Sequence, residues 1–303
     1  MIPRELEERL KLQLGGEYAE FEGFLSTPAK TTFRVNTLKA EVGEVLEGLE
    51  EFAGKSGSAI EPIPWLSNGF KTDAKVGESV EHFQGLIYIQ EAASMLSAVA
   101  LDPKPAELVL DLTAAPGSKT TQMAAMMENR GCIIANELNY KRLKTLRFNL
   151  NRMGVANTIV TNNDGMKFNS KMKFDKILLD APCSNTGQLR DNPDATGAWS
   201  LSKVKNCAQT QMRLLDNAVK CLKDDGIIVY STCTFAPEEN EGVVDYAVRE
   251  HGLKIEGFEG KFMRHQGMTE WGGRTYSSEV EKCVRIYPHE NDTDGFFMAR
   301  LSR

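Results

Sequence analysis

The feature that most constrains the fold is a run of alternating strands and helices that begins near residue 105. Short apolar stretches bounded by turn residues predict strands at residues 107–112, 131–137, 157–162, 174–180 and 226–232. Amphipathic stretches predict helices near residues 118–129, 139–153, 202–222 and 237–250. This alternation is typical of an α/β fold in which a mostly parallel sheet carries helices on both faces.

Two further strands follow that do not alternate with helices. They are L-K-I-E-G-F at residues 253–258 and D-G-F-F-M-A-R-L at residues 294–301, and no helix is predicted between them. Strands joined by a long irregular connection pair antiparallel at a sheet edge. We therefore predict seven strands, mostly parallel, with an antiparallel edge hairpin. This is the Rossmann-like layout of adenosylmethionine-dependent methyltransferases.

The first hundred residues have another pattern. T-T-F-R-V-N-T-L at residues 31–38 alternates like a strand, apolar residues at helical spacing follow, and I-E-P-I-P-W at residues 60–65 is extended and marked by proline. We predict a small α+β module of βαβ type at residues 1–86 and a catalytic domain at residues 87–303. A helix over residues 88–101 is predicted to bridge them.

The charge and the cysteine content limit the functions that this chain is expected to have. The net charge of −6 gives no general attraction to nucleic acid, although basic residues cluster at Lys141, Arg142, Lys144, Arg147 and Arg152 and at Lys167, Lys171, Lys173 and Lys176. Each cluster is first interpreted as a solvated face. The six cysteines form no C-x-x-C pair, which argues against a metal site and a disulfide framework. No apolar run is long enough to span a membrane, so a cytoplasmic protein is predicted.

A small-residue loop follows the first strand of the alternating run, in V-L-D-L-T-A-A-P-G-S-K-T-T at residues 109–121. A nucleotide-binding P-loop would need glycine at positions 113 and 118, which are Thr113 and Ser118. The dinucleotide fingerprint G-x-G-x-x-G is also absent. The loop still allows a small ligand to approach the backbone over Ala114, Ala115 and Gly117.

Acidic residues end the next three strands. Glu137, Asp164 and Asp180 follow the loop in chain order, and the carboxyl ends of parallel strands meet at one crevice. A carboxylate about 20 residues after such a loop can accept both ribose hydroxyls, which is the role predicted for Glu137. The alternative for each residue alone is a solvated strand end.

Two cysteines are predicted to converge on this crevice. Cys183 follows Asp180 in D-A-P-C-S-N-T-G, and Cys233 lies where the fifth strand meets a helix predicted to begin at Pro237. Thiolates are nucleophiles, and a helix N-terminus favours a nearby thiolate. The remaining cysteines, Cys132, Cys207, Cys221 and Cys283, are predicted to be packing residues.

The combination resembles the Sun (Fmu) family of RNA 5-methylcytosine methyltransferases, in a stand-alone archaeal-like form without an appended RNA-binding domain. The matching stretches are R-V-N-T-L-K (34–39), Q-E-A-A-S-M-L (90–96), D-L-T-A-A-P-G-S-K-T (111–120), D-A-P-C-S-N-T-G (180–187), Y-S-T-C-T-F-A-P-E-E-N-E (230–241) and R-I-Y-P-H-E-N-D-T-D-G-F-F-M-A (285–299). The chain departs from the family's usual residues at Thr113, Ser118 and Asn185.

The resemblance implies a site. S-adenosylmethionine would be held without a metal by Thr113, Ala114, Ala115, Pro116, Gly117, Ser118 and Lys119, with Glu137 on the ribose, Asp164 by the adenine and Asp180 near both the methionine and the base. Cys233 would add to carbon 6 of cytosine, so that carbon 5 can accept the methyl group. Cys183 would help to release the product.

The implied substrate is structured RNA, with tRNA favoured over rRNA and the target cytosine turned out of its stack. Arg34 and Lys39 in the N-terminal module are expected to bind the RNA backbone, and no obligate protein partner is predicted. Two alternatives stay open. One is a DNA-type cytosine methyltransferase, in which the proline-cysteine thiol of Cys183 would attack, and the other is a non-catalytic RNA-binding protein on the same scaffold.

Overall fold

The computed structural model describes residues 2–190 and 199–303. Its α-helices are α1 (Arg4–Leu14), α2 (Tyr18–Phe24), α3 (Val42–Gly54), α4 (Val80–Gln84), α5 (Leu96–Leu101), α6 (Ser118–Met126), α7 (Tyr140–Arg152), α8 (Leu201–Cys221), α9 (Glu241–His251) and α10 (Pro288–Asn291). Its strands are β1 (Thr31–Val35), β2 (Ile60–Pro62), β3 (Gly69–Thr72), β4 (Ile87–Ile89), β5 (Leu108–Asp111), β6 (Cys132–Asn136), β7 (Thr158–Thr161), β8 (Phe174–Asp180), β9 (Leu222–Thr232), β10 (Lys254–Glu256), β11 (His265–Gln266), β12 (Glu270–Trp271), β13 (Arg274–Thr275), β14 (Val284–Ile286) and β15 (Phe296–Ser302).

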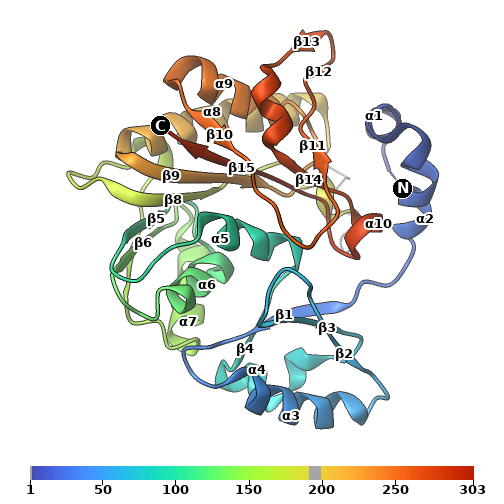
Figure 1. Cartoon of the computed structure of the whole chain (residues 1–303), viewed down its shortest axis with the longest axis vertical. Coiled ribbons are helices and arrows are strands. Elements are labelled where there is room, and N and C mark those ends of the chain that lie inside the picture. Colours follow the sequence, from blue (N-terminus) through green and yellow to red (C-terminus); the bar gives the residue numbers. More distant parts are fainter. Residues whose placement is uncertain (1, 191–198) are drawn as a thin grey trace.

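The main sheet confirms the predicted α/β fold (Figure 1). Strands β7, β6, β5, β8 and β9 are parallel neighbours in that order. They correspond to the five predicted strands, although β9 begins four residues earlier than expected. Because β8 and β9 are adjacent, the carboxyl ends that carry the two candidate cysteines lie side by side.

The closing strands are more elaborate than predicted. Strand β10 pairs antiparallel with β15, as expected, but β15 also pairs with β9 and β14. Strand β11 extends the edge beyond β14, so that the described sheet has nine strands rather than seven. The connection also contains the short helix α10, where none was predicted. Strands of two or three residues are too short to give a period-2 signal.

Both faces of the main sheet are covered. Helices α8 and α9 pack on one face, in a core that includes Leu215, Val244 and the sheet residue Tyr230. Helices α5 and α6 pack on the other face, with Leu96 and Met123 in contact with the core. The crevice at the carboxyl ends of the strands is thereby framed by helices on two sides.

The N-terminal module is an antiparallel sheet rather than the predicted βαβ unit. Its strand order is β2, β3, β1, β4, and β1 pairs antiparallel with both β3 and β4. Helix α3 covers it with Val45, Leu49 and Ala53, which are spaced four residues apart. The predicted helix over residues 88–101 is wrong in its first part, because β4 and a 3-10 helix at Ala93–Met95 come before α5.

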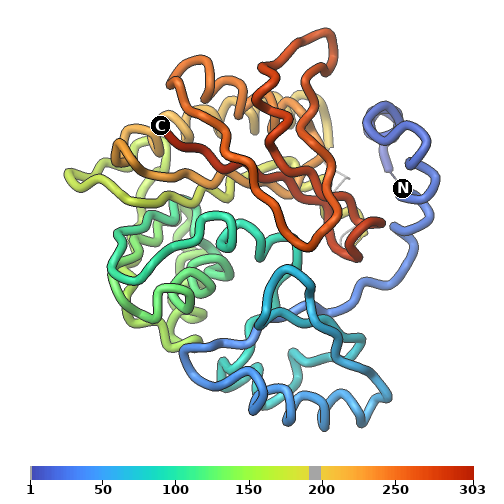
Figure 2. Tube along the Cα trace, viewed as in Figure 1, coloured from blue at the N-terminus to red at the C-terminus, as the bar shows by residue number. Residues whose placement is uncertain are grey.

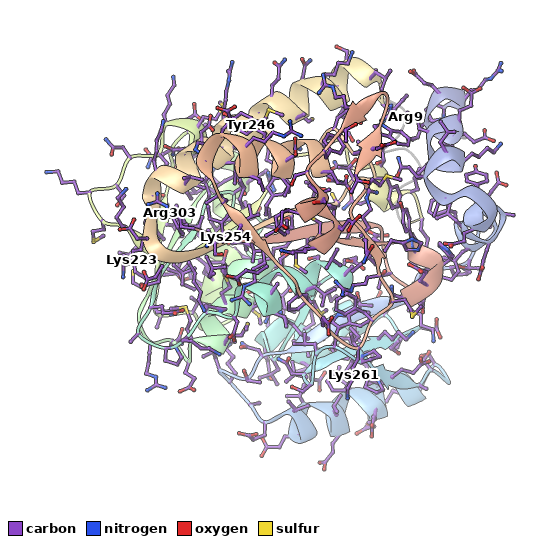
Figure 3. The ribbon with its side chains drawn as sticks, turned by 45° about the horizontal axis from the view of Figure 1, so that its top comes forward. Arg9, Lys223, Tyr246, Lys254, Lys261 and Arg303 are labelled. Carbon is purple, nitrogen blue, oxygen red and sulfur yellow. The ribbon has the colours of Figure 1, made fainter. Side chains whose placement is uncertain are left out.

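Helices α1 and α2 lie apart from this small sheet and pack beside the C-terminal segments, as the trace in Figure 2 shows. Phe21 of α2 makes edge contacts with Phe235 and Tyr287. Arg9, labelled on α1 in Figure 3, lies 5.0 Å from the Trp271 ring centroid. The division at residues 86 and 87 stays a prediction. Helices α1 and α2, which lie before that division, contact residues of the C-terminal part of the chain.

No helix within residues 2–190 and 199–303 combines the length and the apolar character that crossing a bilayer requires.

Candidate active site

A cleft of about 770 Å³ opens at the carboxyl ends of the parallel strands. Its walls include ten of the twelve candidate residues: Thr113, Ala115, Pro116, Ser118, Lys119, Glu137, Asp164, Asp180, Cys183 and Cys233. Ala114 and Gly117 do not line it. The strand-end series and both candidate cysteines therefore share one cavity, of a size that suits a small cofactor together with part of a substrate.

The loop after β5 is fixed by its neighbours. Thr113 donates from Oγ1 to the Asp180 carbonyl at 2.8 Å, and the Ala114 N–H donates to the Asn136 carbonyl at 2.8 Å. Gly117 has a φ of 105°, and a Cβ there would lie 2.9 Å from Cδ1 of Leu146. The glycine is therefore required for backbone conformation and for packing against α7.

Helix α7 supports the same loop through two residues that the sequence reasoning did not select. The Arg142 guanidinium donates to the Ala115 carbonyl and lies 3.7 Å from Oε2 of Glu137. Asn149 donates from Nδ2 to the Pro116 carbonyl at 2.9 Å. Arg142 was interpreted as part of a solvated basic cluster. Its i, i+7 spacing to Asn149 on one helix face is the signal that could have linked the two residues.

The acids that end β6 and β7 are held by local backbone bonds. Glu137 is 5% exposed, and its Oε1 accepts the Asn139 N–H at 2.7 Å. Asp164 accepts the Met166 N–H at 3.0 Å. These bonds orient the two carboxylates while leaving other lone pairs for a ligand.

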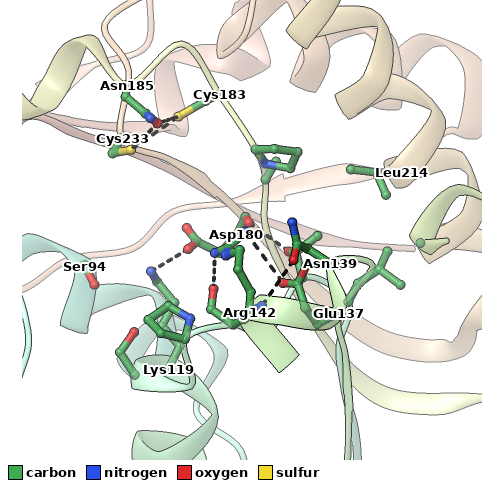
Figure 4. Close-up of a pocket in the computed structure, with 18 of the residues that line it drawn as sticks. Ser94, Lys119, Glu137, Asn139, Arg142, Asp180, Cys183, Asn185, Leu214 and Cys233 are labelled. Atoms are coloured by element: carbon green, nitrogen blue, oxygen red, sulfur yellow. Dashed lines mark hydrogen bonds and ion pairs between the residues drawn. The ribbon is translucent and has the colours of Figure 1, made fainter. Parts of the chain in front are cut away.

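Asp180 is the centre of a polar network (Figure 4). Its Oδ2 lies 2.7 Å from Nζ of Lys119, and its Oδ1 accepts from Ser231 at 2.9 Å. Burial lowers the pKa of the Lys119 ammonium, but the negative groups around it, with the Asp180 carboxylate first among them, together outweigh burial and raise that pKa above its ordinary value. Lys119 therefore stays charged in the floor of the cleft.

The two candidate thiols touch. Sγ of Cys183 lies 3.3 Å from Sγ of Cys233, and both lie next to Oδ1 of Asn185, at 3.2 and 3.3 Å respectively. The hydrogen bond with Cys233, together with burial, raises the pKa of the Cys183 thiol well above its ordinary value. Cys183 therefore retains its proton at neutral pH.

The turn that carries Cys233 corrects the predicted start of the next helix. Helix α9 begins at Glu241, and the Pro237 stretch forms turns instead. Glu239 is fully buried and accepts from the Ser184 N–H at 3.0 Å and from Nε2 of Gln211 at 2.9 Å. Asn240 donates from Nδ2 to the Thr234 carbonyl at 2.8 Å. The P-E-E-N stretch thus clamps the turns of both cysteines rather than starting the helix.

The other four cysteines lie outside the main cleft. Cys221 and Cys283 are buried, whereas Cys132 and Cys207 are half-buried. Burial raises the pKa of each of these thiols, that of Cys207 to about 11. All four are protonated at neutral pH and are poor nucleophiles.

Arg34 does not face solvent, which overturns its expected contact with the RNA backbone. It is fully buried, donates from Nε to Gln90 at 2.9 Å and donates to the Ser118 carbonyl at 2.9 Å. Lys39 is exposed, but its ammonium donates to the backbone carbonyls of Gln84 and Arg152, each at 2.7 Å. Arg34 links the N-terminal sheet to the start of α6 and hence to the cleft.

Comparison with known proteins agrees with this geometry. Residues 98–302 match the family described as 16S rRNA methyltransferase RsmB/F, and residues 2–92 match the N-terminal domain of 16S rRNA methyltransferase RsmF. The chain belongs to the RsmB/F family of methyltransferases.

Relatives within the RsmB/F family differ in length. A tRNA (cytosine(49)-C(5))-methyltransferase of Pyrococcus abyssi is 44% identical, over 94% of this chain and 91% of its own. Ribosomal RNA small subunit methyltransferase F of Vibrio cholerae is 38% identical over 95% of this chain, which spans only 60% of that relative.

Solved structures give the RsmB/F fold directly. A methyltransferase homolog protein from Pyrococcus horikoshii has a TM-score of 0.83 at 34% identity, with 99% of each chain covered. NSun6 from the same organism, determined with SFG, has a TM-score of 0.85 at 26% identity, covering 99% of this chain and 98% of its own.

Proposed function

We propose that this RsmB/F-family enzyme transfers a methyl group from S-adenosylmethionine to carbon 5 of a cytosine in structured RNA, with tRNA favoured. The observation that carries the proposal is the contact between two thiols, 3.3 Å apart, in the same cleft as the acidic strand ends. One thiol can add to a pyrimidine ring while the other remains beside the reacting carbons.

The residues on the cleft wall fit S-adenosylmethionine chemically. Glu137 and Asp164 offer acceptors for the ribose hydroxyls and the adenine amine, and Asp180 offers one for the methionine ammonium. Lys119 and the N-terminus of α6 supply positive charge for the methionine carboxylate. The bound cofactor would supply an electrophilic methyl group, and the proposed chemistry needs no metal.

Cys233 is the proposed nucleophile. Its sulfur would form a bond to carbon 6 of the cytosine, and the electrons displaced to carbon 5 would take the methyl group of S-adenosylmethionine, with S-adenosylhomocysteine as the leaving group. Cys183 is the weaker candidate, because burial and the nearby Glu239 carboxylate disfavour an anion at its sulfur.

Cys183 and Asp180 have supporting roles in this proposal. Once carbon 5 carries the methyl group, the proton on that carbon must leave so that the bond from Cys233 to carbon 6 can break. Cys183, in contact with Cys233, would accept that proton as a thiolate, because bonding of Cys233 to carbon 6 removes the hydrogen bond and the charge that otherwise hold a proton on Cys183. The Cys233 sulfur then leaves carbon 6 as a thiolate. Asp180, oriented by Lys119 and Ser231, would hydrogen-bond to the polar edge of the ring.

The preference for tRNA rests on identity. The chain is 44% identical to the Pyrococcus abyssi tRNA enzyme and 38% identical to the ribosomal RNA enzyme from Vibrio cholerae. An rRNA substrate is the second candidate, since the matched family is described by 16S rRNA. We also propose an RNA-binding module at residues 1–86, a catalytic domain at residues 87–303, a cytoplasmic location and no obligate protein partner.

The experiment supplies labelled S-adenosylmethionine and separate pools of unmodified tRNA, rRNA and DNA to the purified chain. Label in the tRNA pool, found at carbon 5 of cytosine, is the expected result. Label only in rRNA would move the substrate to the second candidate, and label in DNA would overturn the RNA assignment. Binding of RNA without any transfer would favour the non-catalytic scaffold.

A further inference from the structure

We propose that Asn185 is a catalytic residue whose side-chain amide holds the sulfurs of Cys183 and Cys233 together and stabilises the thiolate that attacks the base. The inference rests on the proposed function, because it assumes that one of these sulfurs reacts.

The geometry places the amide against both sulfurs at once (Figure 4). Oδ1 of Asn185 lies 3.2 Å from Sγ of Cys183 and 3.3 Å from Sγ of Cys233, and the sulfurs are 3.3 Å apart. The three atoms form a nearly equilateral triangle. When both cysteines are thiols, each S–H can donate to the same amide oxygen.

The backbone fixes the amide in this position. Asn185 has a φ of 62° and a ψ of 24°, a left-handed conformation that asparagine tolerates better than most residues. Two residues later, the Gly187 N–H donates to the Cys233 carbonyl at 2.9 Å. Glycine also fits a left-handed backbone. Asn185→Gly therefore removes the amide without straining the turn.

The Asn185 amide can form hydrogen bonds with the two cysteines both when they are thiols and when one of them is a thiolate. A thiolate cannot donate to Oδ1, but a half-turn of the amide points Nδ2 at the sulfur. No hydrogen bond of Nδ2 of Asn185 is found within residues 2–190 and 199–303, so the half-turn gives up the two S–H bonds to Oδ1 and no bond of Nδ2. The thiolate of Cys233 would then accept from Nδ2 and from the S–H of Cys183. Hydrogen bonds to a charged form favour that form.

Charged groups on the neighbouring elements act on the same sulfurs. The Lys119 ammonium of α6 and the Asp180 carboxylate at the end of β8 line the same cleft as Cys233 and form an ion pair with each other at 2.7 Å. Glu239, in the turn before α9, acts on Cys183 and opposes an anion there. These groups remain in place in Asn185 variants, so a change in thiolate formation reports on the amide.

The amide is badly placed to recognise the base itself. The sulfur of Cys233 is proposed to add to carbon 6, and the ring edge formed by carbons 5 and 6 carries no hydrogen-bonding group. Asn185 lies at that edge because it touches the reacting sulfurs. Its polar atoms therefore serve the thiols.

The test measures the rate at which iodoacetamide alkylates Cys233 as a function of pH, resolved by peptide mass spectrometry, in enzyme without RNA or S-adenosylmethionine. Loss of one hydrogen bond to a charged group should move the midpoint of Asn185→Gly upward by about one pH unit, or roughly tenfold less thiolate at neutral pH. Asn185→Asp, which adds a negative charge beside both sulfurs, should move the midpoint further upward.

The matched control is Asn129→Gly. Asn129 is also left-handed, with a φ of 56°, and its amide bonds the Gly154 carbonyl and the Ala156 N–H, at 3.0 Å each, away from the cleft. Its midpoint should equal that of the native protein. An unchanged midpoint in a folded Asn185→Gly, or a lower midpoint in Asn185→Asp, would overturn the inference. Because the assay contains no RNA, the proposed methyl transfer can fail without affecting this result.

Discussion

Replacing Glu239 with alanine should destabilise the fold far more than replacing its neighbour Glu238. Glu239 is fully buried, and its Oε2 accepts from the Ser184 N–H at 3.0 Å and from Nε2 of Gln211 at 2.9 Å. Without the carboxylate, the buried Ser184 N–H loses its acceptor. Nε2 of Gln211 still donates a hydrogen bond to the Pro182 carbonyl at 2.9 Å.

An unsatisfied buried donor costs about 1–3 kcal/mol, and a hydrogen bond to a charged group contributes a similar amount. Burial raises the pKa of Glu239, which shows that desolvation of its carboxylate offsets part of this gain. We therefore expect Glu239→Ala to lower the free energy of unfolding by about 2–4 kcal/mol. Glu238→Ala removes the 2.6 Å pair with Arg9, whose two side chains remain partly exposed at 22% and 15%, and should cost about 1 kcal/mol.

Urea denaturation followed by circular dichroism measures both variants. With a slope of roughly 3 kcal/mol per molar urea, the midpoint of Glu239→Ala should fall by roughly 1 M, and that of Glu238→Ala should barely move. Equal midpoints for the two variants would refute the argument that Glu239 clamps the turns of Cys183 and Cys233.

Three further predictions follow from other contacts. Burial raises the pKa of Asp111 to about 7 from an ordinary 3.8, so its contribution to stability is fully present below about pH 4 and is lost as the pH rises through about 7. Asp111→Asn should remove this pH dependence, on the order of 4 kcal/mol, and an unchanged profile of thermal stability against pH would contradict it. Glu137→Ala should raise the dissociation constant for S-adenosylmethionine roughly 10- to 100-fold in calorimetry, and equal affinity would count against its contact with the ribose. Arg34→Gln should lower thermal stability without changing the salt dependence of RNA binding, because its guanidinium is buried; a weaker salt dependence would mean that Arg34 reaches phosphate.

The parallel part of the fold was predictable because its strands are apolar runs bounded by turn residues and its helices are amphipathic. Strands β5 to β8 begin and end within two residues of their predicted positions, and the strand ends place Glu137, Asp164 and Asp180 at one cleft. The order of β8 and β9 then brings Cys183 and Cys233 together. Each of these steps depends on local periodicity and on the rule that parallel strands share one carboxyl edge.

The remaining features depend on tertiary contacts that no local pattern encodes. As a charged residue in a predicted strand, Arg34 is expected at the surface. It is instead buried against the Ser118 carbonyl, because β1 lies next to the start of α6. Pro237 and its acidic neighbours are typical of a helix start, but Glu239 is buried, where it accepts hydrogen bonds from Ser184 and Gln211. The contact of Asn185 with both sulfurs appears only when two distant turns meet.

The most direct test of the central claim is to trap the covalent RNA adduct. Cys183→Ala and Cys233→Ala would each be incubated with S-adenosylmethionine and unmodified tRNA and then run on a denaturing gel. If Cys233 adds to carbon 6 and Cys183 assists release, Cys183→Ala should accumulate a band containing both protein and RNA, and Cys233→Ala should give neither band nor methyl transfer. An adduct in Cys233→Ala and none in Cys183→Ala would contradict the account, because the attacking sulfur would then be Cys183.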